Sequence, residues 1–309
     1  MVSNVINKDV DLIILLNKKL SGSDFYIFVK TIHMPNIPTD VLQFLEQPYH
    51  LTQEQIDHYD RYRFIKLKEV LSPEVVSFYA DIISHKVTEL NQQTSSMDDR
   101  NTYGKAFLQI FNLWREDEQI KALVFSKRLA KIASDLMQTK GARLYHDQAL
   151  FKEPGGGFTP WHADQYYWPL ETDKTVTAWL PLQAIGFNMG PLEFSAGSQI
   201  IVEGRELSIS DESEKFIDQK LRVTDFEHVV EEFELGEISF HSGWVFHRAG
   251  PNETDQMRKV MTVIYMDQDM KLKNPENDNQ VNDWHTWCPG SIVGEKIQSP
   301  INPLLYTNS

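Results

Sequence analysis

A long series of short apolar segments is the feature that most restricts what this chain can fold into. From about residue 141 to residue 268, apolar-rich runs alternate with Gly, Pro, Asn and Asp. Runs this short between turn-forming residues are typical of β-strands, and a series of them predicts a sandwich, a jelly roll or a barrel. The predicted strands are 143–152, 158–164, 175–182, 191–194, 229–233, 237–240, 244–248 and 258–266.

Helical patterns precede these strands. A capped helix is expected over residues 52–62, and alternating apolar and charged residues predict a strand over 64–70. Ser72 followed by proline predicts the start of a helix that reaches about residue 90. Apolar residues at helical spacing predict one further long helix over residues 119–139.

The chain is expected to form one main domain, because 309 residues are enough to bury a large core. We interpret residues 1–50 as an N-terminal extension and residues 51–309 as the domain. Residues 51–140 would supply its helices, and residues 204–228 would form a charged insertion that is helical or mobile. Residues 269–309 form a polar and aromatic tail without clear periodicity.

Charge, cysteine content and the N-terminal sequence restrict the partners and the compartment that we expect. The formal charge of −14 argues against nucleic acid, because a basic surface would supply most of that affinity. Cys288 is the single cysteine, so an internal disulfide is impossible, which favours a reducing compartment. No signal-peptide pattern is present, and the apolar run Leu12–Leu16 is too short to span a bilayer. We therefore expect a cytoplasmic protein with no nucleic-acid partner and no membrane partner.

A set of polar side chains within the predicted strands has the chemistry of a metal site. His162 and Asp164 stand two residues apart, so a strand would present both on one face. Both His241 and His247 could supply a third ligand. His247 is favoured, because a predicted turn follows it and returns the chain toward Arg258, whose guanidinium suits a carboxylate. Two histidines and one carboxylate leave one side of a metal open, as in non-haem Fe(II) oxygenases.

Several further motifs stand in a fixed order around these residues. They are Tyr145–Gln148, Lys152–Pro154, Pro160–Asp164, Thr177–Trp179, Gly190–Leu192, Gly197–Ser198 and His247–Asn252. With Arg258 eleven positions beyond His247, this set resembles the phytanoyl-CoA dioxygenase family over about residues 51–306. Members of that family are Fe(II)- and 2-oxoglutarate-dependent oxygenases. The resemblance implies a mainly β fold with flanking helices, a double-stranded β-helix of the cupin-like, jelly-roll kind.

The resemblance also implies a role for each candidate residue. Arg258 would bind the far carboxylate of the cosubstrate 2-oxoglutarate. Gln148 and Trp179 would line the cosubstrate, and ordinary filling of the barrel interior is the alternative explanation for them. The Fe(II) ligands that the resemblance implies are His162, Asp164 and His247.

The implied reaction is hydroxylation of an unactivated C–H bond of a small-molecule metabolite, with O2 consumed and succinate and CO2 released. Related halogenases have a small residue where Asp164 stands, so the carboxylate favours hydroxylation. Desaturation, epoxidation and ring closure remain open. Two alternatives from other classes are a non-catalytic cupin-like binding module and a zinc hydrolase that uses the same ligands.

Aromatic residues near the predicted site suggest a walled pocket with the tail as part of a lid. The alternative is that most of these rings fill the interior of the fold. They are Tyr166, Tyr167, Trp168, Trp244, Trp284 and Trp287.

Overall fold

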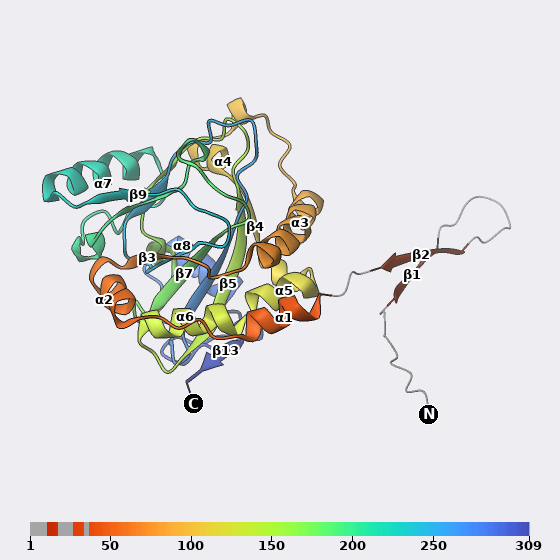
Figure 1. The fold of residues 1–309 in the computed structure, drawn as a ribbon. Helices are drawn as coiled ribbons and strands as arrows, with labels where there is room; N and C mark the ends of the chain where they lie inside the picture. Colours follow the sequence, from red (N-terminus) through yellow and green to blue (C-terminus); the bar gives the residue numbers. More distant parts are fainter. Residues whose placement is uncertain (1–10, 18–26, 34–36, 309) are drawn as a thin grey trace. The chain divides into compact units, whose positions relative to one another are not determined.

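The computed structural model describes residues 11–17, 27–33 and 37–308 (Figure 1). The chain divides into two compact units, Met1–Leu42 and Gln43–Ser309. In the first unit, strand β1 (Asp11–Asn17) pairs antiparallel with strand β2 (Ile27–His33). Helix α1 (Thr39–Glu46) follows them along the chain.

The second unit contains two antiparallel sheets. The larger sheet has the strand order β13-β5-β12-β7-β10-β3, with β4 also paired to β5, and the smaller sheet has the order β6-β11-β8-β9. The strands of the larger sheet are β3 (Phe64–Leu67), β4 (Leu108–Phe111), β5 (Gly141–Phe151), β7 (Thr175–Pro181), β10 (Ile238–His241), β12 (Val260–Asp267) and β13 (Leu304–Thr307). The strands of the smaller sheet are β6 (Thr159–His162), β8 (Leu192–Ser195), β9 (His228–Val230) and β11 (His247–Ala249).

The eight strands predicted from the short apolar runs correspond to β5 through β12, so the predicted mainly β fold with flanking helices is confirmed. The strand expected over residues 64–70 is present as the shorter β3, which pairs with the edge of β10. The sheets stay separate rather than closing into one barrel.

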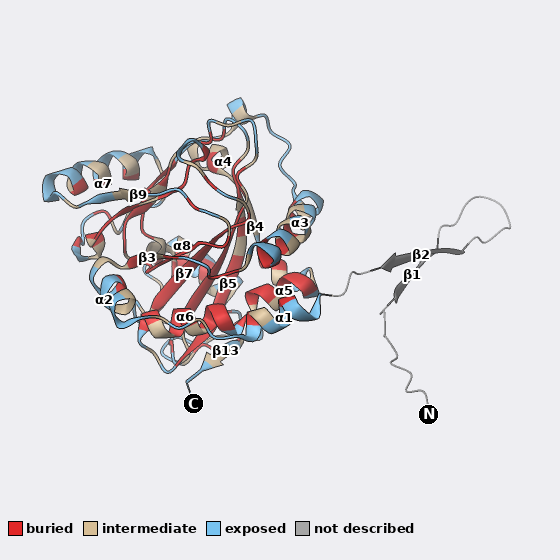
Figure 2. Cartoon of the chain, in the orientation of Figure 1, coloured by how far each residue is buried: buried red, intermediate tan, exposed pale blue. Residues whose placement is uncertain are grey.

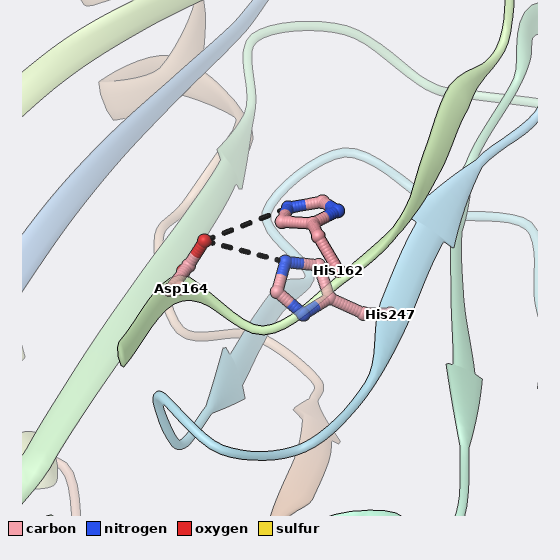
Figure 3. Close-up of side chains that lie close together, drawn as sticks. All are labelled: His162, Asp164 and His247. Carbon is pink, nitrogen blue, oxygen red and sulfur yellow. Dashed lines mark ion pairs between the residues drawn. The ribbon is translucent and has the colours of Figure 1, made fainter. Parts of the chain in front are cut away.

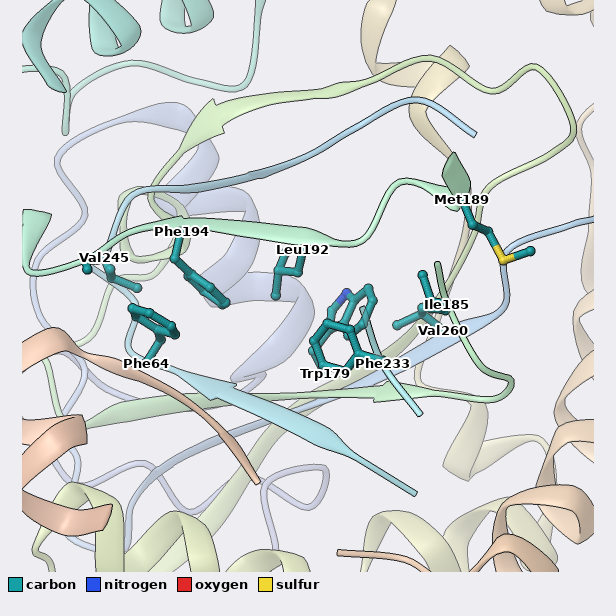
Figure 4. Close-up of a cluster of buried hydrophobic side chains, with 10 residues drawn as sticks. Phe64, Trp179, Ile185, Met189, Leu192, Phe194, Phe233, Val245 and Val260 are labelled. Atoms are coloured by element: carbon teal, nitrogen blue, oxygen red, sulfur yellow. The ribbon is translucent and has the colours of Figure 1, made fainter. Parts of the chain in front are cut away.

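An apolar cluster joins the two sheets (Figure 4). Phe64 of β3 stacks on Phe194 of β8, with ring centroids 4.2 Å apart and planes 12° from parallel. Trp179 of β7 meets Phe233 at 4.8 Å in the same cluster. Side chains from both sheets therefore share one core, because each sheet can bury its apolar face only against the other.

Helices cover the larger sheet on its outer side (Figure 2). Helix α6 (Lys127–Met137) packs across β5, β7, β12 and β13 and buries Leu129, Ile132 and Leu136. The capped starts expected at residues 52 and 72 are confirmed. Helix α2 (Gln53–Tyr62) has a capping box at Thr52, and α3 (Pro73–Leu90) is capped by the Ser72 hydroxyl.

The prediction of one long helix over residues 119–139 is wrong. Helix α5 (Glu118–Val124) ends at Phe125, and Ser126 caps a new helix, α6. The Ser126 hydroxyl also donates to the Leu45 carbonyl, at 3.0 Å. Apolar spacing runs through the break because both helices are buried, so the periodicity alone did not reveal it.

The predicted insertion contains helix α7 (Asp211–Thr224), so its helical alternative is confirmed. The tail has more regular structure than its sequence pattern indicated, since helix α8 (Asp278–Trp287) and strand β13 lie within it. The residues that α8 buries are the polar Gln280 and Asp283, which explains why no apolar periodicity marks it. The remaining elements are α4 (Thr102–Ala106) and 3₁₀ helices at Met97–Asp99, Leu113–Arg115, Asp164–Tyr167, Phe187–Met189 and Ser198–Ile200.

Within the described ranges, no helix combines the length and apolar character needed to cross a bilayer.

Candidate metal centre

The three predicted metal ligands lie together (Figure 3). His162 ends β6, His247 begins β11, and the two residues are paired in register across these antiparallel strands. Asp164 begins the 3₁₀ helix that follows β6. Its Oδ1 lies 3.6 Å from the Nε2 of each histidine, and the three ligand atoms lie within 4.8 Å of one another.

Backbone hydrogen bonds fix the orientation of both histidine rings. The Nδ1 atom of His162 is 2.7 Å from the Pro160 carbonyl, and Nδ1 of His247 is 3.0 Å from the Val245 carbonyl. Because a carbonyl only accepts, each Nδ1 carries a proton, and each Nε2 is the ring nitrogen that faces Asp164. Such second contacts on the far ring nitrogen are typical of metal-binding histidines.

The protonation states also suit a cation. Burial, together with the neighbouring His162, holds the pKa of His247 well below its usual range, so its ring is neutral. Burial opposes ionisation of Asp164, but His247, His162 and His241 outweigh it and hold the pKa of this carboxyl well below its usual range. Two imidazoles and one carboxylate form a donor set that fits Fe(II) or another divalent transition metal.

The second oxygen of Asp164 is held by two further residues. Thr177 Oγ1 donates to Oδ2 at 3.2 Å, and His241 Nε2 lies 3.5 Å from the same atom. Thr177 and His241 face each other across the β7–β10 pair, so both reach Asp164 from one side. His241, the rival candidate for third ligand, therefore contacts the carboxylate from behind, and His247 completes the donor set.

Arg258 lines the same cavity as the three ligands. The residue is 1% exposed, and its Nη1 donates to the Gly190 carbonyl at 2.6 Å. No carboxylate in the described part of the chain forms an ion pair with it, and burial lowers its pKa to about 9. A buried cation without an anionic partner is unfavourable, so this site suits an incoming carboxylate.

Gln148 and Trp179 also line this cavity, which has a volume of about 300 Å³. Trp179 belongs to the apolar core as well, and the Arg258 guanidinium carbon lies 5.6 Å from its ring centroid. Gln148 accepts a hydrogen bond from Gln109 at 2.6 Å, and Gln109 in turn accepts one from Tyr103. Gln148 and Trp179 can therefore both fill the interior of the fold and line the candidate site.

Of the aromatic residues expected around the pocket, Tyr167, Trp168 and Trp287 line the cavity. Trp244 instead packs beneath α7 and stacks on Arg205, 4.4 Å from its guanidinium carbon. Sequence reasoning assigned no place in the site to several other lining residues. Among them are Tyr103, Gln109, His146 and Asp283.

The fold and the donor set together define a class. A jelly roll with a histidine and a carboxylate two residues apart, a distal histidine and an open side is the arrangement of non-haem metal oxygenases. The profile of the family described as Phytanoyl-CoA dioxygenase (PhyH) matches residues 59–260. The chain therefore belongs to this family of oxygenases, as its motifs predicted.

Solved structures with the same fold support the assignment. SnoK, a non-heme alpha ketoglutarate dependent carbocyclase from nogalamycin biosynthesis, aligns with a TM-score of 0.67 at 20% identity, covering 84% of this chain and 99% of its own. The epimerase SnoN, in complex with Fe3+, alpha ketoglutarate and nogalamycin RO, gives 0.67 at 20% identity, covering 82% and 98%. EctD from S. alaskensis, with 2-oxoglutarate and 5-hydroxyectoine, gives 0.63 at 16% identity, covering 81% and 89%.

At these sequence identities the structural similarity shows the fold, and the predicted double-stranded β-helix is confirmed. No curated protein matches the sequence.

Proposed function

We propose that this chain is an Fe(II)- and 2-oxoglutarate-dependent dioxygenase that hydroxylates a C–H bond of a small-molecule metabolite. The observation that carries the proposal is one cavity that joins a pre-oriented set of two imidazoles and a carboxylate to a buried arginine without an anionic partner. His162, Asp164 and His247 would hold the metal. Arg258 would bind the carboxylate at the far end of the cosubstrate.

When bound, iron with 2-oxoglutarate supplies the power to insert one oxygen atom of O2 into a C–H bond, with succinate and CO2 as coproducts. The protein's own residues position the reactants. Thr177 and His241 hold one oxygen of Asp164 and leave the other facing the histidines. Trp179, 3% exposed, covers one side of Arg258 and keeps water from the guanidinium.

Both SnoN and EctD were crystallised with this cosubstrate and a small organic molecule, which supports a small-molecule substrate here. The carboxylate at Asp164 supports hydroxylation rather than halogenation. We assign the activity to the domain over residues 51–309, with residues 1–50 as an extension, and we place the protein in the cytoplasm, where the buried thiol of Cys288 would stay reduced.

The test measures succinate formed from 2-oxoglutarate in the presence of O2, ascorbate and added Fe(II). Wild-type protein is expected to bind 2-oxoglutarate only with metal present and to release succinate. His162→Ala is expected to lose tight Fe(II) binding, because one of three ligands is removed. His50→Ala changes an exposed histidine in the same way and serves as the matched control.

Unchanged metal affinity in His162→Ala would remove this residue from the site. Protein that binds metal but neither binds nor consumes 2-oxoglutarate would favour the binding module instead.

A further inference from the structure

The cavity that contains the candidate metal ligands extends to helix α8 of the tail. This helix is attached to the segment that follows the metal ligand Asp164, since Gln280 Nε2 donates to the Tyr166 carbonyl at 3.0 Å and Asn279 Nδ2 donates to the Tyr166 hydroxyl at 3.1 Å. Asp283 of α8 lines the cavity. It lies beyond residues 59–260, the part matched to the family profile, so the family match assigns it no role.

Asp283 is a carboxyl group without a cationic partner. It is 8% exposed, and its Oδ2 accepts a hydrogen bond from the Tyr145 hydroxyl at 3.2 Å. Among the residues that the structure describes, no lysine, arginine or histidine forms an ion pair with it. Burial raises its pKa to about 7, although Tyr145 and Trp287 donate to it. Neutral donors thus only partly compensate a charge that a cation would balance.

The cations that line the cavity serve other groups. Arg248 is already paired with Glu193 Oε2 at 2.9 Å and with Glu214 Oε1 at 2.8 Å. Arg258 lies in the part of the cavity that we assign to 2-oxoglutarate. His146 lines the wall near α8, and burial lowers its pKa to about 4, so it is neutral. The α8 end of the cavity therefore has a carboxyl group and no positive charge of its own.

Aromatic rings surround this end of the cavity. Phe111 and Trp287 meet at 4.8 Å between ring centroids, and the His146 ring contacts the same indole at 4.8 Å, tilted by 31°. Tyr103 lies within electrostatic reach of both Asp164 and Asp283; burial and these two carboxylates raise its pKa to about 12, so it remains a phenol. A carboxylate beside aromatic faces is an environment that attracts organic cations, by charge pairing and by cation–π contact.

We propose that the substrate carries a protonated amine and that Asp283 is the residue that selects it, with Trp287 and Phe111 packing against the cationic group. The inference rests on the proposed function, because it concerns the substrate of the same site. The net charge of −14 supports it, since a negative surface attracts cations during diffusional encounter. The amine would lie at the α8 end while the C–H bond to be oxidised faces the metal ligands.

The experiment compares three probes with one carbon skeleton: phenethylamine, phenethyl alcohol and phenylacetate. Their affinities are measured by calorimetry and ligand-observed NMR on protein loaded with Mn(II) and 2-oxoglutarate, and again on protein without either. We expect the amine to bind about tenfold more tightly than the alcohol, because a buried charged hydrogen bond adds to the shared apolar contacts. The carboxylate is expected to bind most weakly.

Asp283→Asn tests the residue itself, because asparagine keeps an acceptor for the Tyr145 hydroxyl but removes the charge. We expect it to abolish the preference for the amine. Asp278→Asn, the same change at an exposed position of α8, is expected to leave that preference unchanged.

The proposal is overturned if wild-type protein binds amine and alcohol equally, if none of the probes binds at millimolar concentration, or if Asp283→Asn keeps the preference. The wild-type comparison decides the matter even if the variant fails to fold. Cosubstrate binding is measured in the same samples. Loss of 2-oxoglutarate binding contradicts the proposed function, whereas loss of amine selectivity alone contradicts only the role of Asp283.

Discussion

Replacing Arg258 by methionine should have opposite effects on the free protein and on its complex with 2-oxoglutarate. The arginine is fully buried, its Nε has no hydrogen-bond partner, and its charge has no anionic neighbour in the described structure. Loss of the hydrogen bond to the Gly190 carbonyl costs about 1 kcal/mol. Removal of an uncompensated buried charge recovers its desolvation penalty, on the order of several kcal/mol. The free energy of unfolding of the ligand-free protein should therefore stay level or rise.

The complex should behave differently, because the carboxylate of 2-oxoglutarate would lose its partner. Breaking a buried charge pair costs about 3–5 kcal/mol, and each 1.4 kcal/mol is a factor of about ten in affinity. We therefore expect the Kd for 2-oxoglutarate to rise at least about 100-fold in Arg258→Met. With the cosubstrate at about 100 times the wild-type Kd, ligand binding stabilises wild-type protein by about 2.7 kcal/mol and the variant by about 0.4 kcal/mol.

The assay is thermal unfolding with Mn(II) at increasing concentrations of 2-oxoglutarate. At about 2 °C per kcal/mol, the Tm of wild-type protein should rise by about 5 °C and that of Arg258→Met by about 1 °C. Arg248→Met is the matched control: its cation lines the same cavity but is already paired with two glutamates, so this change should lower the Tm of the free protein and preserve the ligand-induced rise. An unchanged 2-oxoglutarate shift in Arg258→Met, or a large loss of Tm in its ligand-free form, would refute the reasoning.

Two further substitutions test the groups around the site. Thr177→Val removes the hydroxyl that holds Asp164, and we expect the affinity for divalent metal to fall about 10- to 100-fold. Chelator competition measures this affinity. Thr175→Val is the same change two residues earlier in β7, and it should leave the affinity within about a factor of two. Lys152 is fully buried, and burial lowers its pKa from 10.5 to about 6. Between these two pH values the unfolded chain therefore binds more protons than the folded chain. The free energy of unfolding should consequently rise with pH from about 6 to about 10.5. Lys152→Met should abolish this contribution, and denaturant unfolding of both proteins from pH 6 to pH 10 measures it; parallel pH profiles would contradict the assignment.

The strands were predictable because turn-forming residues bound each of them and because they share one core. The candidate metal ligands could be predicted because His162 and Asp164 stand two residues apart in the sequence and Arg258 follows His247 at a fixed distance. Local sequence contains this information directly. The hydrogen bonds that orient both imidazoles come from carbonyls two residues earlier, so they too are local.

Pairings between distant strands could not be predicted in the same way. His241 and Thr177 both contact Asp164 because β10 lies beside β7, a neighbourhood that the order of the strands along the chain does not specify. The place of Asp283 in the cavity depends on where α8 packs, and the buried side of that helix is polar. Periodicity identifies apolar surfaces, so it misses a helix that is attached through amide hydrogen bonds.

The site ultimately depends on the register of one short strand pair. His247 faces His162 across β11 and β6, and a slip of one residue would turn one imidazole to the opposite face of the sheet. The pairing shifts by one residue between His247 and Ala249, and Pro160 and Trp161 lie between the paired positions on β6. Proline lacks the N–H that a regular ladder would use, so an irregularity beside it costs little. On its other side β11 pairs regularly with β8, whose Phe194 stacks on Phe64 of the opposing sheet. The apolar core thus fixes the register, and the register brings the two imidazoles together before any metal binds.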